Sequence, residues 1–155
     1  MTTLTLARLR SEAERCIYCE QKPCQTACPA HCSPADFIMA AAMQEDSDFK
    51  RAAAMILAHN PMGATCGATC PETHCQAACS RVGYDVPIDI PPIQASLVKR
   101  AADLGLRPEF VVPEANGRMV AIVGAGPAGL VAGFTLVQSG YAVEIFDRMD
   151  RPGGA

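Results

Sequence analysis

Nine cysteines dominate this chain, and eight of them stand in two short runs whose spacing limits what the chain can fold around. The first run has gaps of two, four and three residues and consists of Cys16, Cys19, Cys24 and Cys28. The second run has gaps of three, four and three residues and consists of Cys66, Cys70, Cys75 and Cys79. Proline follows Cys28 and Cys70, and Cys32 is the ninth cysteine. Such spacing is typical of chains whose thiolates converge on an inorganic group.

The spacing of the two runs favours iron–sulfur clusters. A 4Fe–4S cluster needs four ligands, and a short loop delivers two or three thiolates while a remote cysteine completes the set. Runs that end in Cys-Pro are typical of proteins with two clusters, in which the last cysteine of a run serves the other cluster. The odd ninth cysteine argues against a framework made only of disulfides.

Disulfides and structural zinc are the alternatives for these cysteines. Disulfides require an oxidising compartment, and the N-terminal segment MTTLTLARLRSEAERC has no apolar signal core. Zinc sites use paired cysteine knuckles or mixed cysteine and histidine sets, so His74 could join Cys70 and Cys75. The four-residue gaps and the Cys-Pro endings fit zinc poorly. We therefore expect a cytoplasmic metalloprotein rather than a disulfide-bonded one.

Composition narrows the class of protein further. Of the 155 residues, 50% are hydrophobic, the formal net charge is −3, and no apolar stretch approaches the length of a transmembrane helix. No basic stripe is interleaved with aromatic residues. We expect neither nucleic acid nor a membrane as a partner.

Residues 1–107 carry helical patterns and no strand-like alternation. Apolar residues at helical spacing, bounded by cap residues, prolines or glycine, predict helices over Thr5–Arg15, Pro34–Met43, Asp48–His59 and Gln94–Leu104. Val86–Pro92 is rich in proline and is expected to be extended. The first part of the chain is therefore expected to be a mainly α domain that wraps two clusters.

The residue pattern changes after a linker expected at residues 108–117, because β-type runs appear. In residues 118–155, apolar β-type runs at Arg118–Val123 and Tyr141–Phe146 flank a helix expected over Pro127–Ser139. The motif GAGPAG joins the first run to the helix. This order of strand, glycine turn, helix and strand predicts the first β-α-β unit of a Rossmann-type, dinucleotide-binding domain.

Five residues of this unit are candidate nucleotide-binding residues. Gly124 permits the tight turn, Gly126 lets the backbone approach a pyrophosphate, and Gly129 lets helix and strand pack closely. Pro127 opens the helix whose N-terminus would receive the phosphates. Asp147 ends the second strand, where an acid can bond a ribose hydroxyl.

The β-α-β unit is too small to be a complete domain. Two strands and one helix cannot cover both faces of a parallel sheet, and the sequence stops at RPGGA. We expect the 155 residues to be a truncated portion of a longer protein, and to have no NAD(P)H oxidation activity on their own.

The motifs CIYCEQKPCQTACPA, NPMGATCGATCP, CQAAC, PIDIPPIQ and VAIVGAGPAGL resemble a known family. The first part is similar to the N-terminal iron–sulfur domain shared by dihydropyrimidine dehydrogenase and the small subunit of NADPH-dependent glutamate synthase. The end resembles the start of the FAD domain that follows in those proteins. The resemblance implies an electron-entry module, in which NAD(P)H reduces FAD and electrons pass singly through two 4Fe–4S clusters. It implies a partner catalytic subunit or domain that carries a second flavin.

The resemblance also implies how the ligands divide between the two clusters. One cluster would be held by Cys16, Cys19, Cys24 and Cys79. The other would be held by Cys28, Cys70, Cys75 and Gln94. Cys32 and Cys66 would then be buried small side chains rather than ligands. Cys66 lies one turn before Cys70, so the residues alone leave open whether Gln94 or Cys66 is the eighth ligand.

Gln94 and the segment PIDI favour the dihydropyrimidine dehydrogenase branch over glutamate synthase, in which Glu is common near the position of Gln94. The loop Pro71–His74 is one residue shorter than in the pyrimidine enzymes, and Pro91-Pro92 replaces small residues. These differences keep a glutamate synthase small subunit as an alternative function. Two further alternatives are a ferredoxin-like carrier without flavin and a zinc-stabilised interaction module. The final electron acceptor, the choice between NADH and NADPH and the oligomeric state lie outside what the sequence specifies.

Overall fold

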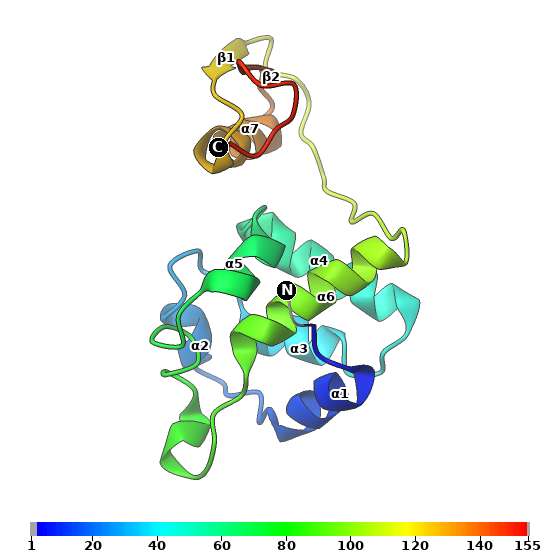
Figure 1. The fold of residues 1–155 in the computed structure, drawn as a ribbon, viewed down its shortest axis with the longest axis vertical. Helices are drawn as coiled ribbons and strands as arrows, with labels where there is room; N and C mark the ends of the chain where they lie inside the picture. Colours follow the sequence, from blue (N-terminus) through cyan, green and yellow to red (C-terminus); the bar gives the residue numbers. More distant parts are fainter. Residues whose placement is uncertain (1–2, 155) are drawn as a thin grey trace. The chain divides into compact units, whose positions relative to one another are not determined.

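The computed structural model describes residues 3–154 of the chain, which divide into two compact units between Glu109 and Phe110 (Figure 1). The boundary between them lies inside the segment 108–117. The first unit is helical and the second combines one helix with a two-stranded parallel sheet. The expected fold class, mainly α with an incomplete Rossmann-type β-α-β unit, is confirmed.

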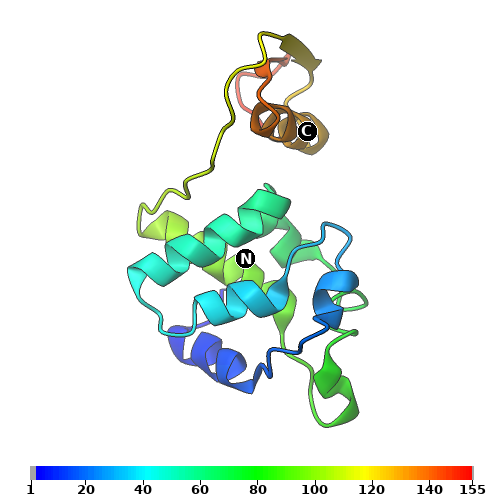
Figure 2. The ribbon, with the colours of Figure 1, turned by 180° about the vertical axis from the view of Figure 1, so that it is seen from behind.

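The first unit is built from short helices joined by the cysteine-bearing loops. In chain order, they are α1 Leu6–Arg15, α2 Pro23–Thr26, α3 Pro34–Ala40, α4 Asp46–His59, α5 Gly63–Thr69 and α6 Ile90–Asp103, with a 3-10 turn, η1, at Ser80–Gly83. α4 and α6 lie side by side, and α3 crosses close to both (Figures 1 and 2). The core lies between these three helices and contains Phe37, Phe49, Ile56, Ile88 and Leu97.

Helix boundaries follow local chemistry more closely than apolar spacing alone. α4 begins two residues before the expected start, because Glu45 and Asp48 cap each other's backbone reciprocally. Ser33 stands at the N-cap position of α3, but its hydroxyl makes no capping hydrogen bond. α3 itself ends at Ala40, earlier than the expected Met43.

The expectation that Val86–Pro92 is extended is wrong for its last residues. α6 begins at Ile90, so Pro91 and Pro92 lie in its first turn. The first four N–H groups of a helix have no intrahelical partner, so proline loses nothing there. The amide of Ile93, the first after the prolines, bonds the carbonyl of Asp89 at 3.3 Å. The helix therefore starts four residues before the expected Gln94.

A buried carboxylate ties α1 to the segment that leads into α6. The Glu12 side chain is fully buried and pairs with Arg8 at 2.9 Å and with Arg15 at 3.0 Å. It also accepts the backbone N–H of Asp89 at 3.3 Å. A buried charge is stable only when it is paired and hydrogen-bonded, so Glu12 has to keep these contacts. The contacts therefore fix the C-terminal end of α1.

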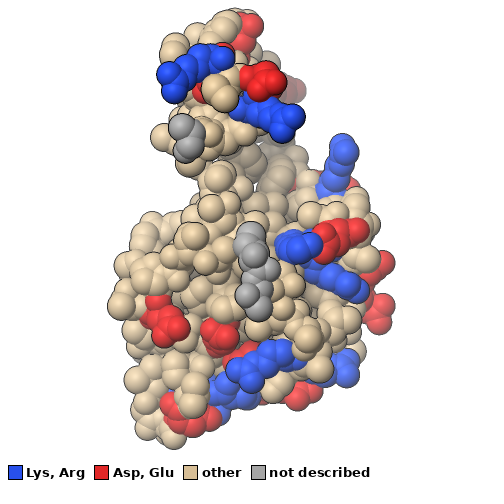
Figure 3. All heavy atoms as spheres, in the orientation of Figure 1, with Lys and Arg blue, Asp and Glu red and all other residues tan. Residues whose placement is uncertain are grey.

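Acidic and basic side chains of the first unit lie intermixed on the face drawn in Figure 3. Several form pairs one helical turn apart, such as Lys99 with Asp103 at 2.6 Å. Within residues 3–154, no helix is both long enough and apolar enough to cross a membrane.

The second unit holds β1 Met119–Val123, α7 Pro127–Gln138 and β2 Ala142–Phe146. The strands pair in parallel, with Met119 opposite Ala142 and Val123 opposite Phe146. α7 covers one face of the sheet, where a Cβ at Gly133 would lie 3.1 Å from Ile145. Val123, in contrast, is 90% exposed.

Candidate iron–sulfur sites and nucleotide-binding loop

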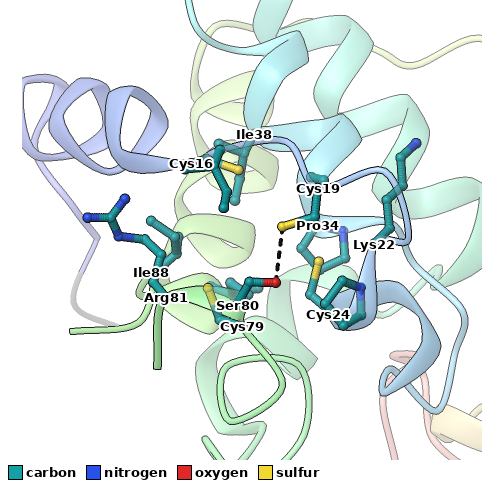
Figure 4. Close-up of a pocket in the computed structure, with 14 residues that line it drawn as sticks. Cys16, Cys19, Lys22, Cys24, Pro34, Ile38, Cys79, Ser80, Arg81 and Ile88 are labelled. Atoms are coloured by element: carbon teal, nitrogen blue, oxygen red, sulfur yellow. Dashed lines mark hydrogen bonds between the residues drawn. The ribbon is translucent and has the colours of Figure 1, made fainter. Parts of the chain in front are cut away.

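Cys16, Cys19, Cys24 and Cys79 line one pocket, the first cysteine pocket (Figure 4). Cys16 caps the end of α1, Cys24 lies in α2, and Cys79 immediately precedes η1. The structure thus brings together the four residues of the first expected ligand set. The thiol of Cys19 donates a hydrogen bond to the hydroxyl of Ser80 at 3.2 Å, a contact that the spacing of the cysteines did not indicate.

Two arginines explain why Cys79 lies beside a cysteine so distant in sequence. The Arg81 side chain donates to the carbonyl of Arg15 at 2.7 Å. The Arg15 side chain donates to the carbonyl of Val86, which follows Arg81 in the same loop. Since Arg15 also pairs with buried Glu12, the loop after Cys79 is anchored on the end of α1. Arg81 also pairs with Asp85, and its role was not identified from the sequence, because the bond that reaches α1 is made to a backbone atom.

The walls of the first cysteine pocket are apolar and include Ile38, Ile88 and Ile90. Burial raises the pKa of Cys16 and Cys24, because an apolar surrounding disfavours the charged thiolate. A bound iron–sulfur cluster would offset that cost by binding the thiolates directly. Four thiols around one apolar pocket are the donor set that a 4Fe–4S cluster requires. Among residues 3–154, no three His, Cys, Asp or Glu side chains form a group that could hold a single metal ion.

A second cysteine pocket contains the other expected ligands, and Cys66 with them. Its polar and sulfur-bearing lining residues are Cys28, Cys66, Cys70, Cys75, Gln94, Asn60 and His74. Burial raises the pKa of Cys75 to about 11. Three cysteines and an amide fit a 4Fe–4S cluster if Gln94 supplies the fourth ligand, and four cysteines fit it if Cys66 does.

The second cysteine pocket depends on a close contact between α5 and α6. A Cβ at Gly67 would lie 2.5 Å from the backbone nitrogen of Ala95 and 2.8 Å from the carbonyl oxygen of Pro91. Only glycine allows the two backbones to approach this closely. The motif GATCGATC showed where the cysteines stand but did not indicate this helix contact.

Gln94 crosses the same helix contact with its side chain. It is buried, and its amide nitrogen donates to the carbonyl of Gly63 at 2.8 Å. This bond commits the nitrogen end of the amide and leaves the oxygen end as the atom that can bind a metal.

The two cysteines expected to be buried differ from each other. Cys32 is 1% exposed, and burial raises its pKa to about 12, so its expected place in the core is confirmed. Cys66 is only partly buried, which corrects the expectation for that residue. Its thiol donates to the amide oxygen of Asn60 at 3.6 Å while it lines the second cysteine pocket.

The sequence did not indicate a network formed by Tyr18, Lys22 and Asp36 beside the first cysteine pocket. Lys22 bonds both oxygens of Asp36, at 2.7 and 2.8 Å, and the Tyr18 hydroxyl donates to the same carboxylate at 2.7 Å. Burial by itself raises the pKa of Asp36, but these bonds outweigh it and lower that pKa to about 2.

The glycine motif of the second unit has the tight geometry that its spacing predicted. Gly124 has a φ of 106°, which L-residues rarely adopt, and a Cβ at Gly129 would lie 1.9 Å from the Gly124 carbonyl oxygen. Gly126 is the N-cap of α7, and Pro127 opens that helix.

Asp147 lies beside this loop and holds it. Its carboxylate accepts the backbone N–H of Ala125 at 2.6 Å and that of Met149 at 2.8 Å. The Ala125 bond, followed by the Met149 bond, lowers the pKa of Asp147. Asp147 also lines a pocket with Gly124 and Arg148. Its observed role is to support the loop, and its contact with a ribose stays a prediction.

Comparison with known proteins gives two family matches. Residues 1–105 match the family described as dihydropyrimidine dehydrogenase domain II, 4Fe-4S cluster, and residues 122–155 match the NAD(P)-binding Rossmann-like domain. The chain is 41% identical over 144 residues to the NAD-dependent dihydropyrimidine dehydrogenase subunit PreT of Escherichia coli K12, covering 92% of this chain and 34% of that protein. It is 29% identical over 146 residues to the glutamate synthase [NADPH] small chain of the same organism, covering 94% and 30%. The chain spans about a third of the length of the curated relatives it matches.

Proposed function

This chain belongs to the family of the dihydropyrimidine dehydrogenase domain II, 4Fe-4S cluster, and from that premise we propose that it is the electron-entry portion of an NAD(P)H-dependent iron–sulfur flavoprotein oxidoreductase. The resemblance inferred from the motifs is thereby confirmed. The observation that carries the proposal is the pair of cysteine pockets, each of which gathers thiols from both cysteine runs.

The first cysteine pocket is proposed to hold one 4Fe–4S cluster through Cys16, Cys19, Cys24 and Cys79. Bound clusters would supply one-electron transfer, which a hydride donor alone cannot. The chain's own part is to fix the four thiols and to exclude water with isoleucine side chains. The Ser80 hydroxyl lies at the pocket beside Cys19 and would favour the negative charge of a thiolate ligand.

The second cysteine pocket is proposed to hold the other 4Fe–4S cluster through Cys28, Cys70, Cys75 and Gln94. The bond from the Gln94 amide nitrogen to Gly63 supports ligation through the amide oxygen. The bond from Cys66 to Asn60 gives that thiol a partner within the protein, which supports the same choice. Cys66 nevertheless lines the pocket and is the competing eighth ligand.

The second unit is proposed to bind the pyrophosphate of FAD at Gly124, Gly126 and Gly129, with Pro127 at the start of the receiving helix. FAD would accept a hydride and release single electrons. Asp147 would hold the loop through Ala125 and contact the ribose from the same edge of the sheet. The nicotinamide cofactor, NADH or NADPH, would bind in the longer protein.

A catalytic subunit or domain that carries a second flavin is the proposed partner. The two relatives are a subunit and a small chain by name, which supports a partner for this chain. Identity of 41% against 29% favours the dihydropyrimidine dehydrogenase branch over glutamate synthase. A cytoplasmic location stays a prediction.

Metal content and spectra of the complete protein, purified without oxygen, test this function. We expect iron and acid-labile sulfide for two 4Fe–4S clusters, two electron paramagnetic resonance signals on reduction, and the structured yellow absorption of FAD. Bound zinc without brown absorption would contradict the proposal in favour of an interaction module. Clusters without FAD would favour a flavin-free electron carrier.

Asp147→Ala is expected to weaken FAD retention in the complete protein by roughly tenfold or more while iron content stays unchanged. The variant removes the acceptor for the Ala125 amide and the proposed ribose contact, each worth about 1 kcal/mol or more for a charged acceptor. Gel filtration followed by flavin and iron quantification measures both. Asp150→Ala, an exposed acid three positions later, is the control. Equal loss of flavin and iron would assign Asp147 to folding instead.

A further inference from the structure

Strained backbone is concentrated in the segment between Cys16 and Cys32. Within residues 3–154, four non-glycine residues have positive φ, and three of them lie between Cys16 and Cys32: Tyr18 (48°), Lys22 (41°) and His31 (51°). Tyr18 and Lys22 flank Cys19, one of the proposed ligands. Lys22 also precedes Pro23, a position that favours extended backbone. Left-handed backbone at such residues persists only where the surrounding structure holds it.

One carboxylate holds both of these residues. Asp36 receives the Lys22 ammonium on its two oxygens, at 2.7 and 2.8 Å, and the Tyr18 hydroxyl at 2.7 Å. The ammonium in turn lies 5.0 Å from the centre of the Tyr18 ring. The three side chains therefore close a network around the backbone of Cys19.

Asp36 is mounted on a part of the molecule that cannot easily move. It lies in the first turn of α3, and its neighbours Phe37 and Ile38 are 0% and 3% exposed in the core. The Lys22 and Asp36 side chains are 26% and 31% exposed, so their pair is partly shielded from water. The pair of Lys99 with Asp103 is more exposed, at 44% and 55%, and exposed pairs of this kind contribute little to stability.

We propose that Asp36 is a positioning residue that holds Tyr18 and Lys22 in left-handed backbone, so that the loop presents Cys19 and Cys24 to the first cysteine pocket before iron binds. This inference rests on the proposed first cluster site. It assigns to the chain a preorganised ligand loop, in which the strain is balanced by side-chain bonds rather than by the metal.

The first test is Asp36→Ala in the complete protein, loaded anaerobically with iron and sulfide and then exposed to a chelator. Iron release from one cluster should become about tenfold faster. This factor corresponds to the free-energy cost of one residue in left-handed backbone that no side-chain bond supports any longer. The electron paramagnetic resonance signal of the other cluster should decay at the unchanged rate. Asp103→Ala, which removes the exposed pair on α6, should alter neither signal.

The second test separates backbone support from charge. In the Asp36→Ala background, Lys22→Gly should restore much of the slow iron release, because glycine adopts positive φ without strain. Lys22→Ala removes the same ammonium but keeps the strain, and should restore nothing. Rescue by both variants, or by neither, would overturn the positioning role. So would unchanged iron release in Asp36→Ala, whereas a wild-type protein that binds no iron would instead overturn the proposed function.

Discussion

Replacing Gly67 by alanine is expected to force α5 away from α6 and to prevent the binding of the cluster proposed for the second cysteine pocket. The new Cβ would meet the nitrogen of Ala95 at 2.5 Å and the carbonyl oxygen of Pro91 at 2.8 Å. Both are backbone atoms of α6, so no side-chain rotation relieves the clash. We expect the free energy of unfolding to fall by about 3 kcal/mol, at the upper end of the range for overpacking.

Urea denaturation of the metal-free protein and iron analysis of the loaded protein measure the two effects of Gly67→Ala. Gly83→Ala is the matched control, because Gly83 follows Cys79 closely and its Cβ would meet nothing within 4 Å. We expect that control to keep both electron paramagnetic resonance signals. If Gly67→Ala keeps both signals and the wild-type denaturation midpoint, α5 and α6 do not pack as described.

Gln94→Ala is expected to abolish or strongly perturb the electron paramagnetic resonance signal of one cluster, while Cys66→Ser spares both signals. Alanine removes the amide oxygen and also the bond from the amide nitrogen to Gly63. A neutral amide in place of a thiolate removes one negative charge, so the Gln94 cluster should have a higher reduction potential than an all-cysteine version. Iron analysis and the intensity of each electron paramagnetic resonance signal show which cluster is lost, and a redox titration measures the reduction potential.

Gln94→Glu separates ligation from packing. Glutamate keeps an oxygen that can bind iron but cannot donate to the Gly63 carbonyl. If Gln94 is a ligand, the cluster survives in this variant and its potential falls. If Gln94 serves only to join α5 and α6, the two oxygens repel the carbonyl and the cluster is lost. Gln21→Ala, an exposed glutamine between Cys19 and Cys24, should change nothing. Loss of a cluster in Cys66→Ser would make Cys66 the eighth ligand.

Apolar periodicity and terminal residues were sufficient to predict α1, α4, α7 and both strands within a few residues. α2 and α5 were missed because they have four and seven residues, and neither carries an apolar repeat. The start of α6 was missed because Pro91 and Pro92 indicate extended chain as readily as a first helical turn. Local sequence cannot distinguish these cases, since the packing of α6 decides between them.

Each cysteine pocket contains one of the ligand sets that the resemblance implied, but the second also contains Cys66, so the ligand sets stay a prediction. The residues that shape the pockets were not predictable. Asp36 stands in the first turn of α3, a common place for an acid, but its bonds reach back to Lys22. Gly67 stands between Cys66 and Cys70 in the sequence, and its contact with Ala95 joins two helices. Both roles come from contacts between distant segments, for which one sequence carries no signal.

The exchange of cysteines between the two runs has a consequence for folding. The first cysteine pocket joins Cys24 to Cys79, and the second joins Cys28 to Cys70, so one closed loop lies inside the other. A group bound in either pocket acts as a covalent cross-link. By loop-closure entropy, a cross-link around roughly 50 residues disfavours the unfolded chain by about 4 kcal/mol. The inner link adds less once the outer one exists, so filling one site prepares the chain for the other.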